Sequence, residues 1–211
     1  MKKVFLLLFC LTITSISING QTAEQLEQVK KIEGTYQLDN DFGYSYVRVF
    51  EDLNANKEEL YNRALSFFPY LVTGTYDARK IIQHEDKEEG IVVAKVAHNA
   101  LATRSNLAHY YEVAATPIWR IDIKENRLRL IISNKNWTLF HRDSSGILVT
   151  EKTEEIPTTK VGPFQKTKPK MDKMYTHAFL RVHVTVEEIM KKFEEHLRKG
   201  SAIQENLNED W

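Results

Sequence analysis

The sequence predicts an α+β domain in which a mainly antiparallel, curved sheet carries two helices on one face. Three observations support this prediction. Several segments alternate apolar and polar residues, as half-buried strands do. Two other segments open with a helix-capping pair and place their apolar residues along one stripe. The order is strand, helix, two hairpins, a further strand and a second helix, and so few helices among the strands favour an α+β arrangement.

The composition is that of a soluble globular chain. The 211 residues suffice for one domain with short appendages, and 42% of them are hydrophobic and 27% charged. These values exclude a fibrous repeat, a wholly disordered chain and a polytopic membrane protein. Basic and acidic residues number 29 each; because the first twenty residues hold two lysines and no acid, the rest carries 27 basic and 29 acidic residues. This balance argues against a nucleic-acid binder, which must neutralise phosphates.

Residues 1–20 have the three-part layout of a secretory signal peptide, with two lysines, an apolar run and a polar stretch of small residues. The apolar run is too short for a spanning helix, which needs about 20 residues. We therefore expect cleavage after Gly20, a secreted or periplasmic location, and no transmembrane segment afterwards. Cys10, the only cysteine, lies inside the apolar run after two bulky residues, so we do not expect a lipoprotein. The mature chain then has no disulfide, thiolate zinc site or cysteine nucleophile.

The first half of the mature chain contains one clear strand and one clear helix. Residues 21–43 are polar and weakly patterned, which indicates a lead-in segment with room for one short helix. Residues 44–51 alternate and are rich in β-branched and aromatic side chains, which predicts a strand. Asn56 and Glu59 form a capping pair that opens a helix over residues 57–68. The apolar stripe of this helix comprises Leu60, Ala64, Leu65 and Phe68.

Two hairpins are predicted in the middle of the chain. Residues 80–85 and 91–98 flank a charged turn, and residues 99–106 are expected to form a loop. Residues 112–123 and 127–133 form the second hairpin. Its apolar and polar residues separate onto two faces, so one side of the sheet should be buried and the other exposed to water. The apolar positions are Trp119, Ile121, Ile123, Leu128, Leu130 and Ile132.

The pattern is lost near residue 134, where we expect a long, mobile insertion at about 134–174, with three prolines and six lysines in its second half. Residues 175–184 alternate again, which predicts a strand. A Thr–Glu capping pair then opens a helix over residues 186–199, and an acidic tail follows at 200–211. Residues 44–199 are thus expected to form a single domain.

Three stretches resemble a secreted Bacteroidetes family described as a domain of unknown function with a TBP-like fold; they are VRVFEDLNANKEELYNRALSFF, KIIQHEDKEEGIVVAKVAH and IWRIDIKENRLRLIISN. The resemblance covers residues 44–134 and, more loosely, 185–199. It implies a strand–helix–four strands–helix layout, a signal peptide and an envelope location. It implies no activity and supplies no catalytic residues, and TBP here describes topology rather than DNA binding. The chain departs from the family pattern at residues 134–175, which are longer and more basic, and in the added strand.

The sequence holds no recognisable motif for catalysis, a cofactor or a metal. The seven histidines have no ligand spacing; His177 and His183 would share a strand face, but no third ligand is evident. Nucleophile-elbow, Walker and dinucleotide-binding motifs are absent. We therefore expect no cofactor, no metal site and no identifiable catalytic residue. Enzymatic activity stays open, because a catalytic carboxylate pair leaves no signature in sequence.

Two functions from different classes follow, with a third behind them. The first is an exported binding or protein-interaction module whose partner in the envelope is a protein, a glycan or a small molecule. The second is a carrier of a small hydrophobic ligand, with a cavity between sheet and helix. An undetected hydrolase is the third.

A cluster of arginines is the candidate partner-binding face. If the buried side of the second hairpin meets the helices, its arginines point to the opposite face, and Arg48 joins them if Val47 and Val49 face inward. Guanidinium groups combine bidentate hydrogen bonding with stacking, which suits an acidic or glycan-bearing partner. The alternative is a solvated face with scattered charges. The candidate residues are Tyr46, Arg48, Arg120, Arg129 and Arg181.

Overall fold

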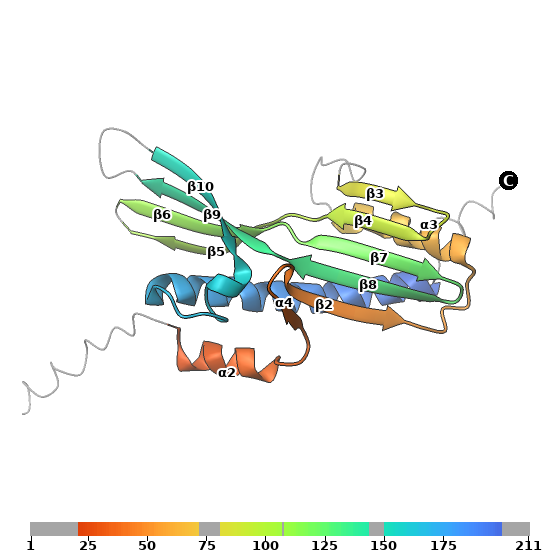
Figure 1. The fold of residues 1–211 in the computed structure, drawn as a ribbon, viewed down its shortest axis with the longest axis horizontal. Coiled ribbons are helices and arrows are strands. Elements are labelled where there is room, and N and C mark those ends of the chain that lie inside the picture. The colour runs from red at the N-terminus through yellow and green to blue at the C-terminus, as the bar shows by residue number, and fades with distance from the viewer. Residues whose placement is uncertain (1–20, 72–80, 107, 144–149, 200–211) are drawn as a thin grey trace, which may run out of the picture.

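The computed structural model describes residues 21–71, 81–106, 108–143 and 150–199. These residues form antiparallel sheets with helices packed against them, which confirms the α+β class (Figure 1). The predicted signal peptide and acidic tail lie outside the described residues. No helix in the described part of the chain is both long and apolar enough to cross a membrane.

Two helices begin at side-chain caps that the sequence encodes. α2 (Ala23–Lys31) lies in the lead-in segment and opens with a capping box between Thr22 and Gln25. α3 (Lys57–Phe67) begins as predicted, with the Asn56 side chain accepting a hydrogen bond from the backbone of the third helical residue. A short 3-10 turn, Phe68–Leu71, continues α3.

α4 (Pro169–Lys199) is one continuous helix of 31 residues. The predicted strand over residues 175–184 was therefore wrong, as was the predicted helix start that followed it. The reason is visible in the burial: the buried positions recur every three or four residues, which is the period of a helix and not of a strand. The buried apolar residues are Met174, Tyr175, Ala178, Phe179, Val182, Val186, Met190, Phe193 and Leu197.

The first sheet has six antiparallel strands in the order β1-β2-β8-β7-β4-β3. The predicted strand near residue 44 and both predicted turns are confirmed, because β3 pairs with β4 across one turn and β7 with β8 across the other. The strands are β1 (Gln37–Asp39), β2 (Gly43–Phe50), β8 (Arg127–Asn134), β7 (Ile118–Lys124), β4 (Ile91–Lys95) and β3 (Ile82–Asp86).

The second sheet has four antiparallel strands in the order β10-β9-β6-β5. Two expectations were wrong here. Residues 99–106 belong mostly to β5 rather than to a loop, and the region at 134–174 is no structureless insertion, since it holds two strands, the 3-10 turn Thr158–Lys160 and the start of α4. Side chains 151–155 of β10 are all exposed, so pairing with β9 rather than alternating burial makes this segment a strand. The strands are β5 (His98–Ser105), β6 (His109–Ala115), β9 (Asn136–Asp143) and β10 (Thr150–Pro157).

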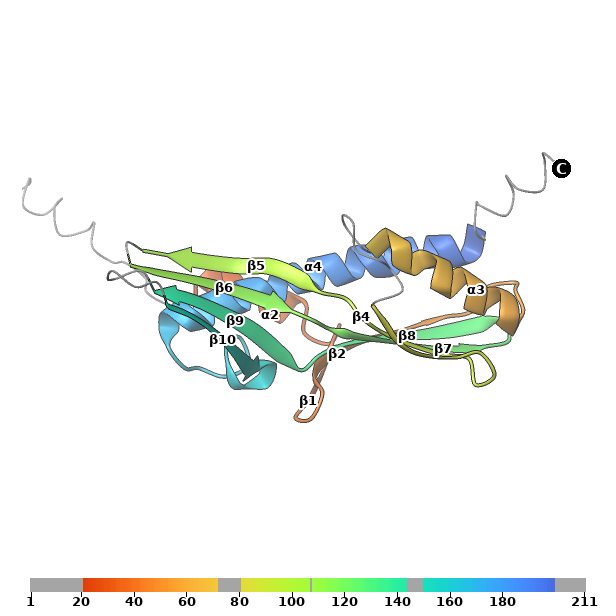
Figure 2. The same cartoon turned by 90° about the horizontal axis from the view of Figure 1, so that it is seen from above.

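Three long ribbons of chain join the two sheets. β4 runs into β5, β6 into β7 and β8 into β9, with only one or two residues between the members of each pair. The strands keep the same neighbours on both sides of the break, as β8-β7-β4 and as β9-β6-β5. One ribbon breaks at Pro117, which has no N–H to donate to a ladder. The result is a strongly curved antiparallel surface, bent where the two sheets meet (Figures 1 and 2).

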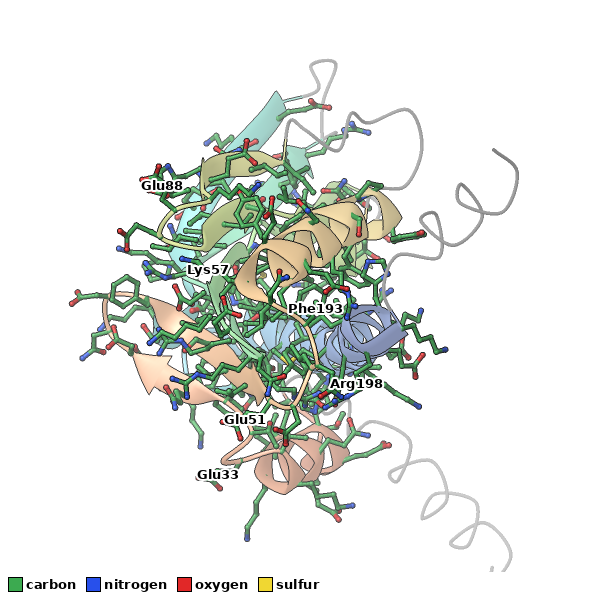
Figure 3. All side chains as sticks on the ribbon, turned by 90° about the vertical axis from the view of Figure 1, so that its right-hand side faces the viewer. Glu33, Glu51, Lys57, Glu88, Phe193 and Arg198 are labelled. Carbon is green, nitrogen blue, oxygen red and sulfur yellow. The ribbon has the colours of Figure 1, made fainter. Side chains whose placement is uncertain are left out.

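The core lies between this surface and the helices. α3 and the C-terminal half of α4 cover one face of the six-stranded sheet (Figure 2), as predicted for two helices on one face, while α4 also contacts β5 and β6. In Figure 3, Phe193 of α4 lies in the interior beside α3, with its ring centre 5.8 Å from Phe50 and 4.9 Å from Phe67. Nearby, the Arg198 guanidinium donates to the backbone carbonyl of Glu51.

Candidate functional site

The predicted arginine face is only partly formed. Arg120 and Arg129 do lie together on the exposed face of the six-stranded sheet, but both bind the carboxylate of Asp122, at 2.8 Å and 2.6 Å. Partial burial acts to raise the pKa of Asp122, yet hydrogen bonds from the two guanidinium groups leave that pKa lowered. The positive charge of this pair is therefore partly compensated within the sheet itself.

The other three predicted residues lie elsewhere. β2 turns Tyr46 and Arg48 toward the helices and exposes its valines, which is the reverse of the expected orientation. Tyr46 is only 1% exposed, and the Arg48 guanidinium lies 2.7 Å from the carboxylate of Glu187 in α4. Arg181 belongs to α4 instead of a strand, and its guanidinium donates to backbone carbonyls of β5. The structure thus brings together two of the five residues.

A second cluster of cations lines a groove between the four-stranded sheet and the start of α4. The groove consists of two adjoining hollows of about 540 Å³ and 380 Å³, which share Arg104 and Lys170. We call this the basic groove. Its cations are Arg104 of β5, Lys152 of β10, Lys168 just before α4, and Lys170 and Lys173 in the first turns of α4.

The register of the four-stranded sheet builds one wall of the basic groove. Arg104 pairs with Tyr111 across β5 and β6, Tyr111 with His141 across β6 and β9, and His141 with Lys152 across β9 and β10. Directly opposed residues in a sheet point to the same side, so these four side chains form one row across it. They lie on the side of the sheet that faces α4, and all four line the larger hollow.

The side chains of this row stack on one another. The guanidinium carbon of Arg104 lies 5.8 Å from the ring centre of Tyr111, and the rings of Tyr111 and His141 are nearly parallel, with centres 4.4 Å apart. A guanidinium over an aromatic ring is attracted by the ring's negative face and keeps its N–H groups free for an anion. The wall can therefore offer both a flat stacking surface and hydrogen-bond donors.

The opposite wall is held in place by Asp172. Its carboxylate is buried and accepts hydrogen bonds from the backbone N–H of Gly162, at 3.3 Å, and from the backbone N–H and hydroxyl of Thr167, at 2.7 and 2.5 Å. A buried carboxylate is stable only with such partners. These bonds tie the segment before α4 to its first turn, and they set the positions of Lys168 and Lys170 on the groove.

The positive charge of the basic groove is not compensated by neighbouring acids. None of its five cations makes an ion pair with another described residue. Among the described residues that line the two hollows, Glu154 alone is acidic. Elsewhere in the described fold, ion pairs occupy Arg48, Arg63, Arg120, Arg129, Arg142 and Arg198. The groove is thus a local excess of positive charge on a chain that is neutral overall.

Sequence reasoning missed the basic groove because its walls come from three separate segments of the chain. One signal was available: the six lysines of the supposed insertion, which make this stretch unusually basic. Only the pairing of β5, β6, β9 and β10 shows that Arg104 and two aromatic rings stand opposite those lysines.

Comparisons with known proteins bear on the fold. No protein-family model matches the chain, and no curated protein matches it. Among solved structures, it is similar to a TBP-like protein from Parabacteroides distasonis, with a TM-score of 0.50 and 14% identity over 74% of this chain and 94% of that chain. A DUF4468 family protein from Bacteroides ovatus aligns with a TM-score of 0.48 and 7% identity over 77% of this chain and 91% of that chain. Likeness at such low identity concerns the fold alone, and the fold of this chain is the TBP-like α+β fold that the sequence resemblance implied.

Proposed function

We propose that this chain is a binding module of the cell envelope and that its basic groove holds an anionic ligand. The observation that carries the proposal is the gathering of five cations without ion-pair partners beside a stacked tyrosine–histidine pair. Like charges held close together repel one another, and an anion seated among them converts that repulsion into attraction. Export is supported by the signal-like pattern of residues 1–20.

The chemistry of the walls defines the class of ligand. The Arg104 guanidinium suits bidentate contact with a carboxylate, phosphate or sulfate, whereas the lysines act as point charges for groups of the same kind. The exposed side of the Tyr111–His141 stack suits a flat or ring-shaped part of the ligand. Hollows of this size hold a small molecule or a few residues of a chain. The expected ligand is therefore a compact polyanion.

Titration calorimetry with three probes tests this proposal: citrate, triglutamate and a sulfated hexasaccharide. We expect at least one probe to bind, and its affinity to fall at high salt because exposed charges are screened. Arg104→Glu combined with Lys170→Glu should weaken that binding by about tenfold or more. The double variant Lys191→Glu, Lys192→Glu makes the same change of charge on an exposed part of α4 and should alter the affinity less than about twofold. Equal losses in the two double variants, or no binding of any probe, would contradict the proposal.

The carrier alternative has no specific observation behind it. It requires an enclosed apolar cavity, whereas the two hollows of the basic groove are open to solvent and have charged walls. The side chains between sheets and helices are large and tightly buried, among them Trp119, Trp137 and Phe179. A binding module with a surface groove therefore agrees better with this distribution of apolar and charged groups.

The hydrolase alternative has one observation, a serine–histidine contact between α3 and α4. The hydroxyl oxygen of Ser66 lies 2.8 Å from Nε2 of His196. However, this hydroxyl donates to the backbone carbonyl of Arg63, at 2.8 Å, and the same His196 nitrogen lies 3.1 Å from that carbonyl. A nucleophile must direct its proton to the base. This contact instead links the two helices through a shared carbonyl.

A further inference from the structure

Three metal-ligating side chains meet where β6 begins and β9 ends. The register places His109 directly opposite Asp143, and His141 lies two residues before Asp143 on β9, so all three point to the same side of the sheet. Nδ1 of His109 is 3.4 Å from Nε2 of His141 and 3.6 Å from Oδ1 of Asp143. These three ligand atoms all lie within 4.8 Å of one another.

This spacing is close to what a metal ion requires. A four-coordinate zinc ion has bonds of about 2.0–2.1 Å, which places neighbouring ligand atoms about 3.4 Å apart. The two separations from His109 match this value, and a small side-chain rotation of Asp143 closes the third. The ring of His141 is held by its stack on Tyr111, and both strands are paired on each side. Most of the site is therefore ordered before any ion binds, which lowers the entropic cost of binding.

The ligand set selects the class of ion. Two imidazoles with one carboxylate suit zinc and the neighbouring transition metals, whereas calcium and magnesium prefer oxygen ligands. Three protein ligands leave at least one position on the ion for water or an external anion. His141 also lines the basic groove, and Lys152 stands opposite it in β10, so an external anion is favoured at that position.

We infer that His109, His141 and Asp143 form a binding site for a divalent transition-metal ion of the zinc class. The site goes beyond the proposed groove function and does not depend on it, since its ligands are defined by the pairing of β6 and β9 alone. The histidine pair considered from sequence is different: His177 and His183 are six residues apart on α4, which places them on different sides of that helix.

The test is titration of the chain with Zn²⁺ alone, followed by calorimetry in a buffer that does not bind metal. We expect one ion per chain and much weaker binding of Ca²⁺ and Mg²⁺. His109→Ala and His141→Ala should each weaken Zn²⁺ binding by at least about tenfold, because even the loss of an outer-shell partner costs about 10–100-fold. His84→Ala removes an exposed histidine of β3 and serves as the matched control, with affinity unchanged within about twofold.

A second measurement covers variants that fold poorly. Zn²⁺ should raise the melting temperature of the original chain and of His84→Ala, but not that of His109→Ala. Binding that persists in both His109→Ala and His141→Ala, binding lost equally in His84→Ala, or equal affinity for Ca²⁺ would overturn the inference. The variant with Arg104→Glu and Lys170→Glu should still bind Zn²⁺, so failure of the basic groove and failure of the metal site are distinguishable.

Discussion

Truncation of Phe193 probes the contact on which the C-terminal half of the fold depends. This side chain is 1% exposed and lies where α4 meets both α3 and the six-stranded sheet. Its ring contacts Phe67 of α3 and Phe50 of β2, with ring centres 4.9 and 5.8 Å away. Phe193→Ala therefore removes the junction of three elements without touching either the basic groove or the metal site.

The expected loss of stability follows from these contacts. Burial of a phenylalanine side chain contributes about 1.5–3 kcal/mol, and each aromatic pair adds about 0.5–1.5 kcal/mol. Two pairs are lost, so we expect Phe193→Ala to lower the free energy of unfolding by about 3–5 kcal/mol, as is usual for such substitutions. Phe193→Leu keeps most of the apolar volume but loses both ring contacts, and should cost about 1–2 kcal/mol.

Urea unfolding followed by circular dichroism and tryptophan fluorescence measures these losses. Trp119 and Trp137 are both buried, one in each sheet, so fluorescence reports on the whole curved surface. Val184→Ala is the matched control, because Val184 lies on the same helix with its side chain exposed, and its effect should stay within about 0.5 kcal/mol. A loss below about 1 kcal/mol for Phe193→Ala, or one no larger than that of the control, would refute the packing argued here.

Two further predictions concern the bend of the sheet and the effect of pH. Gly43 has a φ of +78°, and a Cβ there would lie 2.2 Å from the backbone oxygen of Asn134, so Gly43→Ala should cost about 2 kcal/mol or more in urea unfolding. Gly34→Ala, at a φ of +90° but with open space around it, should cost clearly less; equal costs would contradict the close approach. Burial lowers the pKa of His98 and of His196, so the unfolded chain takes up protons first and stability, complete above pH of about 6.5, should fall as the pH drops below that value. The urea midpoint measured from pH 7.5 to 5 checks this, with a smaller fall expected in His98→Leu; a flat profile would show that these histidines titrate alike in both states.

Elements whose burial alternates or recurs along their own residues could be predicted from sequence. β2 and the β7–β8 hairpin bury every second residue, because one face packs on helices and the other meets water. α3 carries its own cap at Asn56. The orientation of β2 could not be predicted, because Tyr46 and Val47 are both compatible with a buried face. Only the packing of α4 on the tyrosine side decides between them.

The errors arose where burial is set by partners distant in the sequence. Residues 175–184 alternate in part, yet helical spacing fits them as well, and the adjoining helix extended through them once no turn residue intervened. The capping pattern of Thr185 and Glu188 lies in mid-helix, where both side chains serve no cap. β10 has the opposite problem, since its exposed residues give no alternation and only the backbone of β9 makes it a strand.

The candidate sites depend on cross-strand register even more strongly. His109 and His141 are distant in sequence and carry no ligand spacing, so their meeting follows only from the pairing of β6 with β9. The same pairing aligns Arg104, Tyr111 and His141 in one row. A one-residue slip of register would turn these side chains to the other face of the sheet. Both proposed sites are therefore properties of the register and not of any local motif.

The length of α4 allows stability and binding to be perturbed separately. Phe193 and Lys170 lie 23 residues apart on one helix, which corresponds to roughly 35 Å at about 1.5 Å per residue. Substitutions this far apart with no shared partner have additive effects on the free energy of unfolding. Phe193→Leu should therefore destabilise the chain while its affinity for Zn²⁺ and for a polyanion stays unchanged under conditions where it is folded. Because α4 packs as one rigid element against both sheets, a change in either affinity would instead mean that the helix transmits the loss of packing from one end of the molecule to the other.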